Sequence, residues 1–347
     1  MIFRYFWGVS ILSISLLLSC STQIDVNAPS KDILVIYSVL DASADTNFIR
    51  VSKAFLTSGD AIQYAANNDI SLKNAVVTLT GVGGIPEVIT LVSDTTHPKN
   101  QGTFAPQQTV YYTTKRLTPG KTYYLSVSVA DNPALWAKSH TTIPDTPAIT
   151  NPLPPYPTNL GMDTVNDIAG IEKAYYVRFN RSNARSSKRP GRAYEMRAHF
   201  TYGQYRGPGD TLWLPPVIFG PTKPFNESNC DKSSSELCIQ LPEKSLTQLV
   251  VANQPANQSN FVYNNSKRTK ALRFEITALD TFLYNYIYIN NPAFIDFNGI
   301  KPEYSNVENG LGILGSRTSA WREASITPCS EYLMRLNNTF KPEGCKE

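Results

Sequence analysis

Charged residues, histidines and cysteines are scarce in this sequence. Of its 347 residues, 17% are charged, 3 are histidine and 5 are cysteine. It contains no HExxH pair, no G-x-S-x-G nucleophile elbow and no CxxC pair, so it offers no motif of a zinc protease, an α/β-hydrolase or a zinc ribbon. A catalytic group assembled from distant residues would leave no such motif. We expect a protein that is not an enzyme and that needs no cofactor or metal.

A strong excess of charge of either sign is also missing. Without Arg4, which lies in the expected signal segment, 31 basic residues face 28 acidic ones, a net charge of +3. This balance does not favour nucleic acid as a partner. The chain is rich instead in proline (24), glycine (19) and tyrosine (19), a mixture typical of β-rich exported proteins with many turns.

No apolar run at the start of the chain is long enough to span a bilayer of about 30 Å. The run from Val9 to Leu18 is short, follows Arg4 and ends at Ser19 and Cys20, which is the order of a secretory signal. Leu17-Leu18-Ser19-Cys20 resembles a lipobox, so we expect cleavage before an acylated, for example palmitate-bearing, Cys20. An ordinary signal peptide that happens to contain a cysteine is the alternative.

The anchor predicts where the chain resides. Residues 1–19 would be the signal peptide and residues 20–31 the acylated tether. No aspartate follows Cys20 directly, which by resemblance to Gram-negative lipoproteins favours the outer membrane. Whether the protein faces the periplasm or the cell surface stays open.

The first expected domain, residues 32–144, reads as an immunoglobulin- or fibronectin-like β-sandwich. Its clearest signal is the turn Pro119-Gly120 followed by a strictly alternating strand, which places Tyr123, Leu125, Val127 and Val129 on one face. A tyrosine in this position closes back on the preceding backbone in such sandwiches. The fold class predicted is therefore mainly β, with a second β-rich domain that carries minor α structure.

A linker and that second domain follow. Residues 145–157 are rich in proline, which predicts a stiff connector, and residues 158–347 form the β-rich domain. Within it, 246–252 and 279–289 could each be helical, although the aromatic and β-branched residues of the second segment also fit a strand. Four cysteines predict two disulfides, with three possible pairings; sequence proximity favours the local ones, and a metal site is the weaker alternative. They are Cys230, Cys238, Cys329 and Cys345.

A glycine-rich block lies near the end of the chain. Gly310-Leu311-Gly312-Ile313-Leu314-Gly315 satisfies GxGxxG, but a dinucleotide site also needs a strand before it, a helix after it and a later acidic residue. We reject that interpretation and expect a tight turn with close backbone contact. Ser305–Gly315 resembles the SNIxxGlGiFg block of an uncharacterised Bacteroidota lipoprotein family with a domain of unknown function. The resemblance extends to the lipobox, the early strand and the LxPGxxYxLxV corner, and implies an outer-membrane lipoprotein often found beside TonB-dependent transporters.

Two groups of residues are candidates for a ligand or partner surface. The first is a basic cluster, which fits phosphate groups of lipopolysaccharide, an anionic glycan or an acidic partner; a solvated loop is the simpler explanation. The second is aromatic and would stack on sugars; core packing is its simpler explanation. The members are Arg181, Arg185, Lys188, Arg189 and Arg192 in the first group, and Tyr202, Tyr205 and Trp213 in the second.

The functional hypotheses follow from the anchor, the β-rich composition and the resemblance. The first is a binding or accessory lipoprotein beside a TonB-dependent transporter in the outer membrane. The second is a surface adhesin or an envelope-structural protein. A glycan or peptide hydrolase is the third and the least supported, and the ligand is not identified by sequence.

Overall fold

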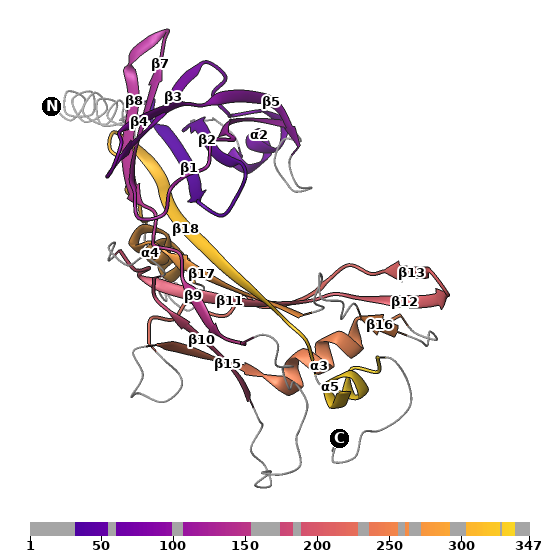
Figure 1. Cartoon of the computed structure of the whole chain (residues 1–347). Helices are drawn as coiled ribbons and strands as arrows, with labels where there is room; N and C mark the ends of the chain where they lie inside the picture. Colours follow the sequence, from indigo (N-terminus) through magenta and orange to yellow (C-terminus); the bar gives the residue numbers. More distant parts are fainter. Residues whose placement is uncertain are drawn as a thin grey trace, which may run out of the picture. The chain divides into compact units, whose positions relative to one another are not determined.

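The computed structural model describes residues 32–54, 60–98, 107–153, 174–182, 189–227, 236–255, 261–263, 272–291, 303–326 and 328–336. These residues form a mainly β structure with several sheets, which confirms the predicted fold class (Figure 1). No helix among them is long and apolar enough to cross a membrane.

The N-terminal sandwich consists of two packed sheets. Their strand orders, β1-β2-β6-β5 and β4-β3-β7-β8, correspond to the ABED and C′CFG orders of immunoglobulin-like domains. The alternating pattern of β7 (Thr122–Val129) turns its predicted face into the core, where Tyr123 is 0% exposed. The other bounds are β1 (Leu34–Asp41), β2 (Asn47–Lys53), β3 (Ala75–Val82), β4 (Glu87–Thr90), β5 (Val92–Pro98), β6 (Gln107–Thr113) and β8 (Asn132–Thr142).

A tyrosine corner closes the sandwich, as the turn before β7 predicts. The backbone N–H of Thr118 donates to the hydroxyl of Tyr123 at 3.0 Å, and that hydroxyl donates to Glu87 at 3.1 Å. Glu87 also accepts from Lys115 and Lys121, each at 2.8 Å. Hydrogen bonds from Lys115 and Lys121 are the main cause that lowers the pKa of Glu87 to about 2.

Replacing Glu87 by glutamine is expected to lower the free energy of unfolding by about 1–2 kcal/mol at neutral pH, because Lys121, which is largely buried, loses its counter-charge. The folded-state pKa of Glu87 lies below its ordinary value of 4.5. Its stabilising contribution is therefore complete above that value and is lost as the pH falls towards about 2. Urea unfolding at several pH values should show the gap between wild type and variant closing over that range.

A matched control is Asp69→Asn, because Asp69 contacts the exposed Lys73 at 3.7 Å and such surface pairs contribute about 0–1 kcal/mol. A gap between wild type and Glu87→Gln that stayed constant with pH would contradict the role assigned to Glu87.

The expected sandwich and the expected β-rich domain after residue 157 share a sheet. The long strand β18 (Gly310–Ala324) pairs in parallel with β1 from Gly310 to Arg317, and antiparallel with β17 (Leu272–Leu279) from Arg317 to Ala324 (Figure 1). One eight-stranded sheet therefore runs through both halves, and residues 33–347 cluster as one compact unit. The sequence did not predict this shared sheet, because alternation shows that a segment is a strand but does not show which strand it pairs with.

The expected linker is also partly a strand. β9 (Ala148–Asn151) pairs with β10 (Ala174–Asn180) and contributes Ile149 to the second core. Residues 154–157 of the linker lie outside the described residues. The proline-rich composition of this segment therefore does not make all of it a connector.

The C-terminal half adds three groups of strands to a second core. The large sheet continues as β14-β11-β17-β18, and the smaller sheets have the orders β15-β10-β9 and β13-β12-β16. The two segments that could be helical, 246–252 and 279–289, lie largely within helices α3 and α4. The remaining bounds are β11 (Ala193–Phe200), β12 (Tyr202–Gly207), β13 (Asp210–Trp213), β14 (Val217–Phe219), β15 (Leu237–Pro242), β16 (Phe261–Tyr263), α2 (Ala61–Asn67), α3 (Glu243–Ala252), α4 (Thr281–Ile289) and α5 (Pro328–Leu333).

The glycine-rich block allows β18 to lie against β1 and α4. Gly312 has a φ of +107°, and a Cβ added there would overlap the carbonyl oxygen of Ile36 on β1. A Cβ at Gly315 would lie 2.9 Å from the Cβ of Leu283 on α4. Asn306 holds the same strand by exchanging two hydrogen bonds of 2.9 Å with the backbone of Leu314. The close backbone contact expected of these glycines is confirmed. The expected tight turn is wrong, because Gly310, Gly312 and Gly315 all lie within strand β18.

Candidate functional site

One face of the large sheet is polar. Along β11, residues such as Met196 and Ala198 point into the second core, so the residues between them point to the opposite side. The same alternation holds along β17 and the second half of β18. We call this surface the ladder face, and its members are Glu195, Arg197, His199, Arg273, Glu275, Thr277, Arg317, Ser319, Trp321 and Glu323.

The strand register arranges these side chains in rows across β11, β17 and β18. Residues directly opposite one another on neighbouring strands lie close enough to interact. Three such rows make up most of the ladder face. The rows are Glu195–Thr277–Ser319, Arg197–Glu275–Trp321 and His199–Arg273–Glu323.

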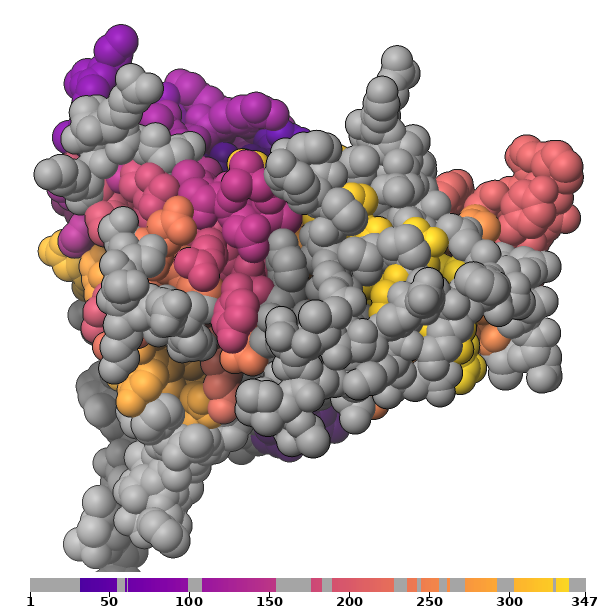
Figure 2. Space-filling view, turned by 60° about the horizontal axis from the view of Figure 1, so that its bottom comes forward, coloured from indigo at the N-terminus to yellow at the C-terminus, as the bar shows by residue number. Residues whose placement is uncertain are grey.

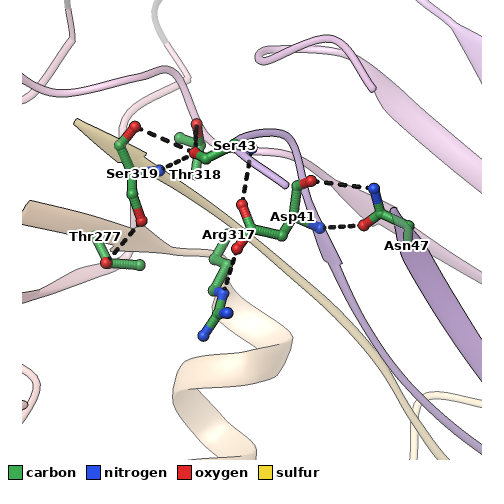
Figure 3. Close-up of polar contacts among 7 residues, drawn as sticks. All are labelled: Asp41, Ser43, Asn47, Thr277, Arg317, Thr318 and Ser319. Atoms are coloured by element: carbon green, nitrogen blue, oxygen red, sulfur yellow. Dashed lines mark hydrogen bonds and ion pairs between the residues drawn. The ribbon is translucent and has the colours of Figure 1, made fainter. Parts of the chain in front are cut away.

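A hydrogen-bonded junction limits the ladder face where β18 changes its pairing partner (Figure 3). The guanidinium of Arg317 donates to Asp41 at 2.7 Å. The hydroxyl of Ser43 accepts from the N–H of Ser319 at 2.6 Å and donates to its carbonyl at 3.1 Å, and the hydroxyls of Ser319 and Thr277 lie 2.9 Å apart. These contacts tie the loop after β1 to β18 and hold the row of Ser319 in place.

Trp321 is the largest exposed side chain of the ladder face, with 55% of its surface accessible. The guanidinium of Arg273 lies 4.6 Å from the centre of its ring, a cation–π contact that fixes both side chains. In the neighbouring strands, His199 Nε2 lies 3.0 Å from Glu275 Oε2. Arg273, His199 and Glu275 near the Trp321 ring therefore already have partners.

Glu195 differs from these groups because its carboxylate has no hydrogen bond or ion pair with any described residue. It is only 9% exposed, and burial raises its pKa, while the charges of Arg197 and Arg317 act in the opposite direction. A buried carboxylate without donors loses the hydrogen bonds that water would supply. Glu323, in the row of Arg273, likewise has no hydrogen bond or ion pair with a described residue.

The aromatic candidates identified from sequence lie on the β12–β13 hairpin, which Figure 2 shows in salmon at the right edge of the view. Tyr205 is 42% and Trp213 is 47% exposed. A Cβ at Gly203, which is opposite Trp213, would lie 3.1 Å from the Trp213 ring. Because Tyr202 points into the core, Gly203 and Tyr205 lie on the other side of β12.

The interpretation of Tyr202 as part of a binding surface is wrong. Its side chain is 1% exposed, packs against Phe261, and donates its hydroxyl proton to the carbonyl of Asn253 at 3.0 Å. The sequence interval between Tyr202 and Tyr205 is odd, so the two side chains of one strand point to opposite sides.

The described members of the basic cluster make intramolecular contacts. Arg181 donates to the carbonyl of Asn226, Arg189 donates to the hydroxyl of Thr122, and Arg192 lies over the ring of Tyr284. Arg185 and Lys188 lie outside the described residues. The three arginines therefore contact three different parts of the chain, at Asn226, Thr122 and Tyr284. Neither the anion-site hypothesis nor the solvated-loop hypothesis predicts these contacts.

The predicted lipidation and disulfide residues are only partly within the described ranges. Cys238 on β15 and Cys329 on α5 are both buried, whereas Cys20, Cys230 and Cys345 lie outside those ranges. The disulfide pairing and the acylation therefore stay predictions. Among the described residues there is no group of three His, Cys, Asp or Glu side chains that could hold a metal.

Sequence reasoning missed Glu195, Arg273 and Trp321. The strands that carry the first two are recognisable, and the alternation of Arg273 and Glu275 with apolar residues signals a polar face. The sequence does not show that β11, β17 and β18 are neighbours, because that adjacency depends on pairing between distant segments.

The chain matches a known protein family. A family described as a domain of unknown function (DUF4249) matches residues 21–322, a range that includes the sandwich and nearly all of the ladder face. No curated protein matches the chain.

Proposed function

We propose a binding role at the outer membrane for this protein, which belongs to the DUF4249 family, a domain of unknown function. In this proposal the chain is held by acyl groups on Cys20. It binds a partner or ligand beside a TonB-dependent transporter and catalyses no reaction. Several acyl chains would hold it essentially permanently, because each buried methylene contributes about 0.8 kcal/mol.

The observation that carries the proposal is the set of large apolar side chains on the β12–β13 hairpin. Tyr205, Leu212 and Trp213 are each at least 40% exposed, although they belong to a hairpin whose base is held in the core by Tyr202. Exposed apolar groups on a fixed element mark interaction sites more often than catalytic ones, and tyrosine and tryptophan are enriched among residues that dominate binding energy. We therefore assign the hairpin to contact with a protein partner.

The charges of the ladder face also favour binding over catalysis. Glu275 lies against His199, and Arg317 lies against Asp41, so these groups stabilise one another. A general acid or base works best with a pKa near the operating pH and with access to the substrate. Glu195, whose pKa burial raises, is nearly buried and lacks that access.

Affinity purification of the full-length tagged protein from detergent-solubilised outer membranes tests the proposal. We expect a TonB-dependent barrel to be recovered in stoichiometric amounts with the wild type, and recovery to fall at least about tenfold with the double variant Tyr205→Ala/Trp213→Ala. The matched control is Tyr124→Ala, because Tyr124 is 49% exposed on β7 of the sandwich and should not alter recovery.

Two further results bear on the anchor and on the alternative role. Radiolabelled palmitate should be incorporated into the wild type and not into Cys20→Ser.

If no barrel is recovered while a deletion strain takes up nutrients normally and attaches poorly to surfaces, the adhesin hypothesis replaces the transporter one.

A further inference from the structure

Strand β13 is the edge strand of its sheet. The order β13-β12-β16 places β12 on one side of it, and no described strand pairs with its other side (Figure 1). The backbone N–H of Leu214 donates to the carbonyl of Tyr202 on β12 at 3.0 Å. Because the N–H groups of an antiparallel strand alternate in direction, Leu212 also points its N–H at β12, whereas Thr211 and Trp213 point theirs away from it.

The side chains of Thr211 and Trp213 leave this edge open. A Cβ added at Gly203 on β12 would lie 2.8 Å from the Cγ2 atom of Thr211 and 3.1 Å from the ring of Trp213, so both side chains lean over β12. No described residue accepts a hydrogen bond from the outward N–H of either residue. The free edge therefore presents unpaired backbone groups at intervals of about 7 Å, the repeat of two residues in a strand.

Other edges of the described sheets carry features that hinder the addition of a further strand. The edge strand β5 has a register shift and ends at Pro98. Strand β8 is bridged by Glu308, and β16 is bridged by Leu336. Strand β13 contains no proline, lysine or arginine, its one charged residue is Asp210 at its start, and its last three residues pair with β12 in regular register.

Apolar side chains lie on both faces of β13 beside the open edge. Successive residues of a strand point to opposite faces, so Leu212 and Trp213, which are 40% and 47% exposed, project from opposite sides. Tyr205, opposite Thr211, lies on the same side as Trp213. A strand paired with β13 would cover apolar surface on both faces, because residues directly opposite one another on paired strands are in contact.

The backbone of the open edge selects the structure of its occupant. Donors and acceptors that repeat at every second residue are matched by another extended chain, which adds to the sheet as a further strand. A helix bonds its interior N–H and C=O groups within itself, so it would leave those of β13 unpaired. An extended segment therefore fits both the backbone of the edge and the apolar side chains beside it.

We infer that β13 binds its protein partner by strand addition: an extended segment of the partner pairs with the free edge of β13 and places apolar side chains beside Leu212 and Trp213. The inference rests on the proposed binding role of the hairpin and specifies what the partner contributes. Main-chain hydrogen bonds then provide affinity, and the apolar side chains provide specificity.

The variant Thr211→Pro tests the inference in the full-length tagged protein purified from outer membranes. Proline removes one outward N–H and leaves the hydrogen bonds between β12 and β13 in place, because its ring replaces a hydrogen that points to the free edge. We expect recovery of the TonB-dependent barrel to fall at least about tenfold. The matched control Thr211→Val keeps the N–H and the shape of the side chain, and should recover the barrel like the wild type.

Amide hydrogen exchange of the wild-type complex gives a second readout, which decides the question if thermal unfolding shows that Thr211→Pro is not folded. The N–H groups of Thr211 and Trp213 should exchange rapidly in the purified protein alone and at least about tenfold more slowly in the complex with the barrel. The N–H of Leu212, which points at β12, is the internal control and should exchange slowly in both.

Four outcomes would overturn the inference. Unchanged exchange at Thr211 and Trp213 in the complex, or full recovery of the barrel by folded Thr211→Pro, would show contact through side chains alone. The proposed function would then stand if Tyr205→Ala/Trp213→Ala still loses the barrel. Slow exchange of both amides in the purified protein, together with a dimer on size-exclusion chromatography, would place a second copy on the edge. If the wild type recovers no barrel, the proposed function and this inference fail together.

Discussion

The Gly312→Ala variant is expected to lose about 3–5 kcal/mol of unfolding free energy, a large fraction of the stability of a typical domain. Two physical effects combine at this position. The φ of +107° is strained for any residue with a Cβ, and the added atom would overlap the carbonyl oxygen of Ile36. The parallel pairing of β1 with β18, which holds the two halves together, would have to shift.

Gly84 offers a control that separates these two effects. Its φ is +105°, almost the same as that of Gly312, but an added Cβ would meet nothing within 4 Å. Gly84→Ala should therefore cost only the backbone strain, about 1 kcal/mol. Urea unfolding of both variants measures the difference, and equal losses would show that close packing of β18 against β1 contributes little.

The second large effect is expected from removing the carboxylate of Asp280, which organises a buried network between the sandwich and α4. Asp280 accepts from the hydroxyl of Thr141 at 2.6 Å, from the N–H of Leu283 at 2.8 Å and from the N–H of Ser316 at 3.1 Å. The residue is 6% exposed. Burial raises its pKa, against the opposing effect of its hydrogen bonds.

Asp280→Ala should lower the unfolding free energy by about 3–4 kcal/mol. The variant leaves two buried backbone N–H groups and a hydroxyl without their acceptor, and it removes the N-cap of α4. Asp280→Asn keeps an acceptor oxygen and the shape of the side chain, so its loss should be clearly smaller. Chemical unfolding followed by circular dichroism measures both variants.

Asp60 provides the comparison, because it caps α2 by accepting from the N–H groups of Ile62 and Gln63 but lies at the surface. Asp60→Ala should cost about 1 kcal/mol, the usual value for an exposed cap. If Asp280→Ala cost no more than Asp60→Ala, the network with Thr141 and Ser316 would add nothing beyond a helix cap.

Much of the fold could be predicted because its signals are local. The Pro119-Gly120 turn and the alternation after it predict a strand with Tyr123 facing the core, and both are found. The N-cap Asp280 explains why the aromatic and β-branched segment after it is a helix, since the cap satisfies an N–H of the first turn. Alternation alone left that segment undecided.

The candidate site was predictable only in part. Tyr205 and Trp213 are exposed, as their interpretation requires, but Tyr202 is a core residue. The described arginines of the basic cluster bond to the chain itself. Glu195 and Trp321 lie on one face of the sheet only because β11, β17 and β18 are neighbouring strands. Short sequence motifs do not reveal which strands are neighbours.

The sequence by itself determined the β-rich character of this protein, its tyrosine corner and the need for glycine at the close contacts of β18, because each depends on neighbouring residues and on the period of a strand. Only the tertiary structure decided that β18 joins both halves and that the ladder face exists. These features depend on contacts such as that of Asp41 with Arg317, which are 276 residues apart. The choice among partners at such distances is made by the packing of the whole chain, through register and shared cores, and not by any local pattern.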